Sequence, residues 1–143
     1  MSKLAAKDVI FTLGMQQHPE GGWYAQTFED GAKVGDRAQS TAIYYLLEAG
    51  DRSHWHRVDA VEVWHFYAGA PLRLCISDGI SVDEHMLGTE LERGQRPQVV
   101  VPTQAWQSAV STGAWTLVGC TVAPGFQFSG FELAEKDWEP GRS

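Results

Sequence analysis

Short segments rich in β-favouring residues recur along the whole chain, and this pattern restricts the possible fold more than any other feature. Turn signals such as Pro19–Gly22 and Asp78-Gly79 separate the segments. The ranges expected to form strands are 23–28, 41–47, 53–57, 62–68, 72–77, 80–87, 99–101, 106–110 and 114–122. A series of roughly eight to ten short strands is typical of an all-β sandwich or barrel, and a barrel also closes its sheet edges.

The first residues of the chain depart from the strand pattern. Apolar residues recur there at helical spacing, Ser2 stands at the N-cap position and Gly14 ends the run. We therefore expect one short helix at about residues 3–13, packed by one face on a larger body. Polar, glycine-containing residues 29–39 favour a surface loop.

Two further features concern turns and domain organisation. Asp78-Gly79 lies between two strand-like runs and favours a two-residue type I′ hairpin turn, because that turn needs positive φ angles. No internal repeat or low-complexity segment is visible. A chain of 143 residues is the size of one domain, so a single domain is expected over residues 1–143.

The charge balance restricts the possible partners. The 18 acidic and 11 basic residues give a net charge of −7, and no cluster of Lys and Arg is present, so nucleic acid is not expected as a partner. The N-terminal apolar run is too short to cross a membrane, and no cleavage signal follows it. Cys75 and Cys120 lie in apolar runs and form no CxxC pair, which favours reduced thiols, although one disulfide stays possible if they are close. Together these features indicate a soluble, cytoplasmic protein without a membrane partner.

Ionisable residues concentrate in one stretch, Gly50–Gly69. Alternate residues of a strand share a face, so His54 and His56 are expected to point the same way. Glu62, on what should be the adjacent strand, can supply a third polar group. If Glu62 faces inward, then Trp64 and Phe66 also do so and add an aromatic wall. The stretch therefore predicts a site at one end of the sheet.

This stretch resembles the first motif of the cupin superfamily. It contains Gly50, then His54-Trp55-His56 after three residues, Glu62 after five more, and Gly69 after a further six, with one gap shorter and one longer than in the family motif. The second cupin motif has a looser counterpart in residues 94–111. Its proline, glycine, histidine and asparagine positions are occupied here by Pro102, Gln104, Gln107 and Ser111.

Four blocks narrow the resemblance to one branch, the small single-domain cupins with an HPEGG motif that were formerly catalogued as a domain of unknown function. The blocks are HPEGGWYAQTF at 18–28, SHWHR at 53–57, EVWHFYAG at 62–69 and GCTVAPGF at 119–126. The resemblance spans roughly residues 5–133. It implies a double-stranded β-helix, or jelly-roll barrel, which is usually dimeric and has no settled reaction.

The resemblance also implies a metal site in the barrel, formed by His54, His56, Glu62 and Gln107. The amide oxygen of Gln107 is a weaker and harder ligand than a histidine nitrogen. A set of two imidazoles, one carboxylate and one amide suits Mn, Fe, Ni or Mg better than a tetrahedral structural zinc. One divalent ion of unknown identity is therefore the predicted cofactor.

Further residues are candidates for contacting a small-molecule ligand. They are Arg57, Trp64, Phe66, Trp106, Trp23 and Gln26. Arg57 could hold an anionic group, or it could instead pair with Asp59 or Glu62. His18 precedes a proline and is explained by turn geometry. Either Tyr44 or Tyr45 must face inward, and the sequence does not decide which.

Three functions remain open. The first is a small-molecule enzyme that uses a divalent ion at the barrel mouth. The second is a metal-free isomerase, similar to the nucleotide-sugar epimerases, in which His56 beside Glu62 is the catalytic base. The third is a binding or sensing module without chemistry. Aromatic residues expected on the outer face also suggest a homodimer.

Overall fold

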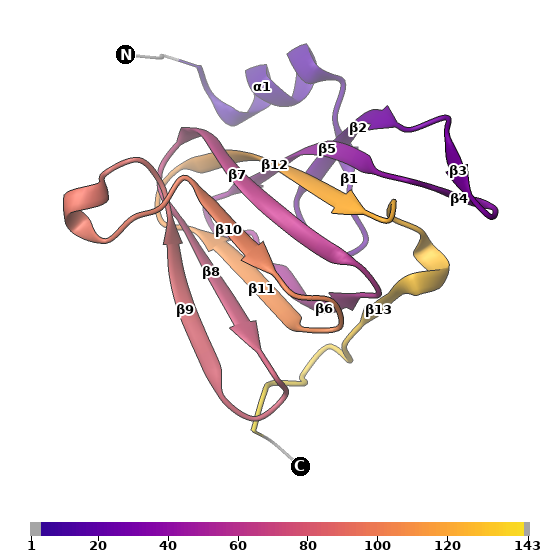
Figure 1. Cartoon of the computed structure of the whole chain (residues 1–143). Coiled ribbons are helices and arrows are strands. Elements are labelled where there is room, and N and C mark those ends of the chain that lie inside the picture. The colour runs from indigo at the N-terminus through magenta and orange to yellow at the C-terminus, as the bar shows by residue number, and fades with distance from the viewer. Residues whose placement is uncertain (1–3, 142–143) are drawn as a thin grey trace.

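Two antiparallel sheets face each other and enclose the interior of the protein, as the computed structural model of residues 4–141 shows (Figure 1). The six-stranded sheet has the order β1 (Gln16–Gln17), β2 (Trp23–Glu29), β5 (Thr41–Glu48), β12 (Trp115–Ala123), β7 (Val61–Gly69) and β10 (Gln98–Val101). The five-stranded sheet has the order β13 (Phe131–Leu133), β6 (Ser53–Val58), β11 (Trp106–Ser111), β8 (Leu72–Ser77) and β9 (Val82–Leu87). The predicted all-β jelly-roll class is confirmed.

The core lies between the sheets and consists of inward-facing residues from both. Its fully buried members include Leu47, Trp64, Leu72, Leu74 and Val118. Each side chain of this size stabilises the fold by about 1.5–3 kcal/mol when it leaves water. The strand β5 is apolar on both faces, because Tyr45 faces this core while Leu46 faces the opposite side.

The helix α1 (Ala6–Leu13) covers the outer face of β5, where its residues Ala6 and Val9 pack against Leu46. The carboxylate of Asp8 accepts the backbone N–H of Ala5 and so satisfies one free donor at the helix start. Gly14, in the left-handed region at φ 65°, ends the helix as predicted. The predicted N-cap, Ser2, lies outside the described residues. Within the described part of the chain, no helix has the length and apolar character needed to cross a membrane.

Two loop predictions need correction. The predicted loop at 29–39 contains a small hairpin formed by β3 (Lys33–Val34) and β4 (Arg37–Ala38), which projects from the barrel in Figure 1. The turn at Asp78-Gly79 belongs to a four-residue loop, since Ser77 pairs with Val82. A side-chain oxygen of Asp78 accepts the N–H groups of Ile80 and Ser81 and thereby stabilises the longer loop. Two short 3-10 turns, η1 (Leu91–Arg93) and η2 (Phe128–Gly130), complete the described elements.

The strands β6 and β7 belong to different sheets, so the prediction that they are adjacent was wrong. The link at Asp59-Ala60 carries the chain across the barrel instead of turning back as a hairpin. Arg37 binds the Asp59 carboxylate at 2.7 Å, and the Asp59 N–H donates to the carbonyl oxygen of Gly130. These contacts hold the crossing, and they place β6 and β7 on opposite walls of the interior.

Candidate functional site

A cavity of about 200 Å³ opens between the two sheets where β6 and β7 meet the crossing link. Its polar wall consists of Gln16, His18, Glu20, Gln26, Thr41, His56, Glu62 and Cys120. Its apolar wall consists of Tyr24, Ile43, Val58, Val122, Phe126 and Phe128. Both carboxyl groups and both imidazoles in the wall are therefore close to one small ligand volume.

The turn after His18 brings Glu20 into this cavity. Gly21 and Gly22 have φ angles of 112° and 78°, a region that side-chain-bearing residues rarely adopt. A Cβ atom on Gly21 would overlap the carbonyl oxygen of Arg52, and one on Gly22 would lie 2.8 Å from the carbonyl oxygen of Leu46. The turn therefore presses against the backbone of Arg52, just before β6, and against that of β5, which explains why both positions are glycine.

Glu20 bridges two histidines with its two carboxyl oxygens. Oε2 lies 3.5 Å from Nε2 of His56 and accepts a hydrogen bond from the Ser53 hydroxyl. Oε1 lies 3.4 Å from Nδ1 of His18. The backbone carbonyl of Glu20 accepts the N–H of His54 at 2.8 Å, which anchors the turn to β6. Burial raises the pKa of the Glu20 carboxyl, because the charged form loses its hydration.

Backbone contacts determine the tautomers of both histidines. Nδ1 of His56 lies 2.7 Å from the carbonyl oxygen of His54, so this nitrogen must carry the proton and donate. The neutral His56 ring then has its lone pair on Nε2, the atom that faces Glu20. Nδ1 of His18 accepts the N–H of Glu20 at 3.1 Å, so the neutral His18 ring carries its proton on Nε2. Burial lowers the pKa of both imidazoles, and for His56 the Glu62 charge partly opposes this effect.

Glu62 lies on β7, across the cavity from β6, and a chain of buried hydrogen bonds orients it. The indole N–H of Trp64 donates to Oε1 of Gln107 at 2.7 Å. The amide nitrogen of Gln107 in turn donates to Oε1 of Glu62 at 2.9 Å. Burial raises the pKa of Glu62 to about 7, although His56 favours the charged form. The carboxyl group is therefore close to half-protonated at neutral pH.

The predicted site residues fall into three groups. His56, Glu62 and Gln26 line the cavity. Gln107 and Trp64 lie behind Glu62 and form the hydrogen-bond chain that orients it, so neither is in the cavity wall. The remaining predicted residues lie elsewhere.

His54 is on the outer face of β6, because a bulge interrupts the strand. Gln107 pairs with His56 while Ala109 pairs with Ser53, so β6 has one residue more than β11 over this interval. Ser53 and His56 consequently both face inward, whereas His54 and Trp55 face outward. Nε2 of His54 contacts the backbone oxygen of Glu135 at 2.8 Å. The expectation that His54 and His56 share a face was wrong for this reason.

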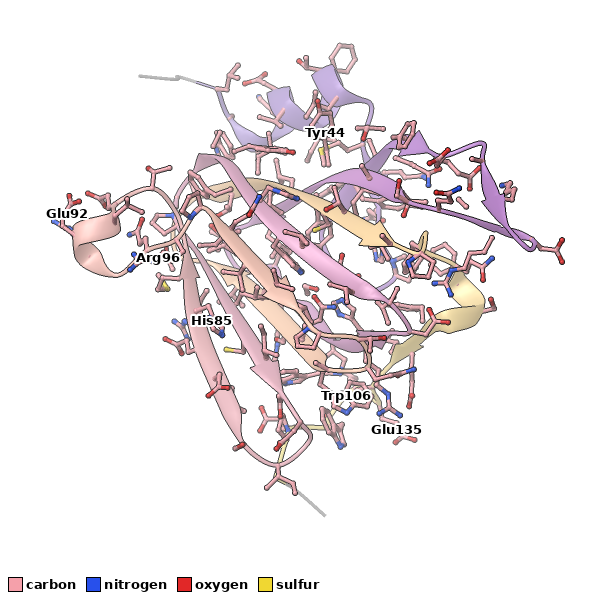
Figure 2. The ribbon with its side chains drawn as sticks, in the orientation of Figure 1. Tyr44, His85, Glu92, Arg96, Trp106 and Glu135 are labelled. Carbon is pink, nitrogen blue, oxygen red and sulfur yellow. The ribbon has the colours of Figure 1, made fainter. Side chains whose placement is uncertain are left out.

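Arg57 and Trp106 also lie on the outer face of the five-stranded sheet. The Arg57 guanidinium pairs with Glu132 at 2.7 Å and lies 4.5 Å from the Trp106 ring. The Trp106 ring packs against Trp138 of the C-terminal segment. Figure 2 shows Trp106 and Glu135 on the side of the molecule opposite Tyr44, which lies near α1. The outer face therefore holds a separate cluster away from the cavity.

Two other aromatic candidates pack into apolar clusters. Trp23 lies with the residues under α1, and Phe66 packs against the central core. The sequence left open which of two tyrosines faces inward, and the structure places Tyr45 in the core and Tyr44 under α1. Neither Trp23 nor Phe66 contributes to the cavity wall.

The four residues predicted to hold a divalent ion do not converge. His54 lies on the outer face, and the Gln107 oxygen that would bind a metal already accepts the Trp64 N–H. Within residues 4–141, no group of three or more His, Cys, Asp or Glu side chains has an arrangement that could hold a metal ion. The predicted four-ligand set therefore does not fit this site. Cys75 and Cys120 are free thiols.

Sequence reasoning missed the participation of His18 and Glu20. The sequence signal was the pair Gly21-Gly22. Consecutive glycines often mark a backbone with positive φ angles that lies close to a neighbouring segment. The identity of that neighbour was not readable, because Glu20 contacts Ser53 and His56 more than thirty residues further along the chain.

The comparisons with known proteins agree with this architecture. A crystal structure of a protein from Shewanella oneidensis is 36% identical, has a TM-score of 0.88 and aligns over 92% of this chain and 85% of that one. A hypothetical protein from Leishmania major is 29% identical, has a TM-score of 0.85 and aligns over 92% and 88%. Oxalate decarboxylase from B. subtilis shares the fold alone, at 13% identity and a TM-score of 0.61 over 82% of this chain and 29% of that one. No curated protein matches the chain significantly.

The two facing antiparallel sheets and their enclosed site define a cupin barrel. A family model described as "Cupin superfamily (DUF985)" matches residues 7–134. The chain belongs to this family, as the resemblance of the HPEGG and histidine blocks implied. Fold and family show a cupin-fold protein, and its cavity has room for a small molecule.

Proposed function

We propose that the protein is a small-molecule enzyme that transfers protons within its cavity, with His56 as base and Glu62 as acid. One observation carries this proposal: a neutral imidazole with its lone pair on the buried Nε2 shares a cavity with a carboxyl group whose pKa is about 7. General acids and bases work best when their pKa values lie near the operating pH.

The arrangement suits a proton abstraction next to a carbonyl group. Nε2 of His56 takes a proton from the carbon, and Glu62, in its protonated form, donates its own proton to the carbonyl oxygen. The products are an enol, an imidazolium and a carboxylate. In an α-hydroxy carbonyl substrate this enol is an enediol. The imidazolium returns its proton to the former carbonyl carbon, and the hydroxyl on the neighbouring carbon returns a proton to Glu62, which leaves a carbonyl group there and regenerates both protein groups. The net reaction is an isomerisation that moves the carbonyl group by one carbon.

The cavity limits the substrate to a small molecule. A volume of about 200 Å³ lies below the 300–1,000 Å³ typical of drug-sized pockets. Arg57, the candidate for holding an anionic group, pairs with Glu132 on the outer face. These observations favour a compact metabolite over a nucleotide-linked one.

Hydrogen–deuterium exchange tests the proposal without knowledge of the product. The protein is incubated in D₂O with a panel of small hydroxyaldehydes, hydroxyketones and amino ketones, and NMR measures deuterium incorporation next to the carbonyl. We expect exchange with the wild-type protein and a loss of about 10²–10⁴-fold in rate for His56→Asn and for Glu62→Gln. His85→Ala, on β9 and outside the cavity wall, is the matched control and should exchange normally.

Exchange that survives His56→Asn would contradict the proposal, as would its absence with every compound. Ligand binding without exchange would favour the alternative of a binding or sensing module. The predicted divalent ion stays a prediction. Elemental analysis after purification with added Mn, Fe, Ni or Mg measures it directly.

A further inference from the structure

The cavity wall holds two carboxyl groups without a nearby Lys or Arg. Glu20 and Glu62 both line it, and among the described lining residues there is no Lys or Arg. The guanidinium groups near β6 and the crossing link make other contacts, and that of Arg52 donates to the hydroxyl of Ser108. Arg57 pairs with Glu132, and Arg37 pairs with Asp59. An anionic ligand would therefore meet carboxyl groups with no counter-charge.

Glu20 and His18 present two hydrogen-bond acceptors to one another. Oε1 of Glu20 lies 3.4 Å from Nδ1 of His18, and that nitrogen already accepts the backbone N–H of Glu20. An imidazole nitrogen has one lone pair, so His18 cannot also donate from this atom. The side chain of Glu20 is only 9% exposed. A ligand with a charged N–H donor in the cavity would find an acceptor in Oε1 of Glu20.

Aromatic rings surround the same end of the cavity. The His18 ring lies 4.7 Å from the Tyr24 ring and 6.4 Å from the Phe128 ring, measured between centroids. Phe126 packs edge-on against Phe128 at 4.9 Å. Tyr24, Phe126 and Phe128 all line the cavity. Aromatic faces beside a carboxylate attract organic cations, because the ring quadrupole and the carboxylate both favour positive charge.

We propose that the cavity binds its ligand through an ammonium group, held between the Glu20 carboxylate and the rings of Tyr24 and Phe128. The ligand class is thus a small organic amine, with the remainder of the molecule directed toward His56 and Glu62. The inference rests on the proposed function only in sharing its cavity, because ammonium binding requires no turnover.

Pairs of probes that differ only in charge test this inference. Choline is compared with its uncharged isostere 3,3-dimethylbutan-1-ol, and ethanolamine with ethylene glycol, by calorimetry and by the shift in melting temperature at pH 8. We expect each ammonium compound to bind at least tenfold more tightly than its uncharged partner. Inorganic phosphate should produce no shift, and Mn²⁺ alone should produce a smaller one than choline.

Variants connect the binding to Glu20 and the aromatic wall. Glu20→Gln preserves shape and should lose at least tenfold in choline affinity while leaving binding of the uncharged isostere unchanged. Glu132→Gln, on the outer face, is the matched charge control and should bind choline normally. Phe128→Leu is the second variant, because Phe128 is 54% exposed at the cavity rim and its replacement should not prevent folding. It should weaken choline binding without affecting ethylene glycol.

Four outcomes would overturn the inference. They are binding of the uncharged isosteres as tightly as the amines, no binding of either amine at millimolar concentration, a response to Mn²⁺ but not to amines, and a folded Glu20→Gln protein that binds choline normally. Failure of the proposed reaction and failure of the proposed ligand class can be distinguished. Amine binding without deuterium exchange rejects only the proposed reaction, whereas exchange on uncharged ketones without amine binding rejects only the ligand class.

Discussion

The carboxyl group of Glu62 retains its proton to about pH 7, because burial between the sheets disfavours the charged form. Its folded-state pKa therefore lies above the ordinary value of 4.5. Between these two values the folded chain binds more protons than the unfolded chain, so the free energy of unfolding falls as the pH rises. At 1.36 kcal/mol per pKa unit, the full effect is roughly 3 kcal/mol and is complete above pH 7.

The neutral variant Glu62→Gln should remove this pH dependence. We expect it to be more stable than the wild type by up to about 3 kcal/mol at pH 8, with the difference shrinking toward zero near pH 4.5. Urea denaturation at several pH values measures the free energy of unfolding. Glu132→Gln, at an exposed ion pair, serves as control and should change stability by only about 0–1 kcal/mol. A Glu62→Gln protein that follows the wild-type pH profile would refute the prediction.

At the scale of one element, the HPEGG turn determines where Glu20 lies. Its close approach to the strand backbone leaves no space for a side chain at Gly21. Gly31 differs from it, because a Cβ atom there would meet no atom within 4 Å.

Alanine substitutions at Gly21 and Gly31 compare a glycine that has no space for a side chain with one that has space. Gly21→Ala combines an unfavourable φ of 112° with overlap at the Arg52 carbonyl, and we expect it to destabilise the fold by about 2–3 kcal/mol. Gly31→Ala should change stability by less than about 0.5 kcal/mol. Thermal denaturation compares the two variants. Equal stabilities would show that the turn does not press on β6 as described.

The bulge in β6 acts at the same scale. It turns His54 outward although the sequence alternation places it beside His56. His54→Ala should therefore leave the deuterium exchange and choline affinity unchanged, because the hydrogen bond from His56 goes to the backbone oxygen of His54, which alanine retains. A loss of either would place the His54 side chain in the cavity after all. Deuterium exchange and choline binding, measured on the purified variant, decide whether the His54 side chain lies outside the cavity or in it.

At the scale of the whole molecule, the outer face of the six-stranded sheet is only partly covered. The helix α1 packs over β5, whereas Tyr67 of β7 and Val100 of β10 are 51% and 55% exposed. The homodimer expected from the outward aromatic residues stays a prediction, and this face is where we expect the contact. Light scattering after size-exclusion chromatography measures the mass. If the expectation holds, Val100→Glu should shift the mass from dimer to monomer, and an unchanged mass would locate the contact elsewhere or exclude it.

The sequence alone determined the longer elements and two of the central side chains. The positions of the longer strands, the end of α1 at Gly14 and the inward placement of His56 and Glu62 follow from periodicity, turn chemistry and the cupin blocks. These are local properties, since a strand alternates its faces and a glycine ends a helix whatever the rest of the chain does.

Only the tertiary structure decided the composition of the site. Three features of the site depend on contacts between distant segments. They are the bulge that turns His54 away from the cavity, the crossing that places β6 opposite β7, and the contacts of Glu20 with Ser53 and His56. As a result of the same contacts, the Gln107 side chain is hydrogen-bonded to Glu62 and Trp64 and is not available as a metal ligand. Hydrogen bonds and burial between the sheets select these arrangements, and no spacing within one strand encodes them.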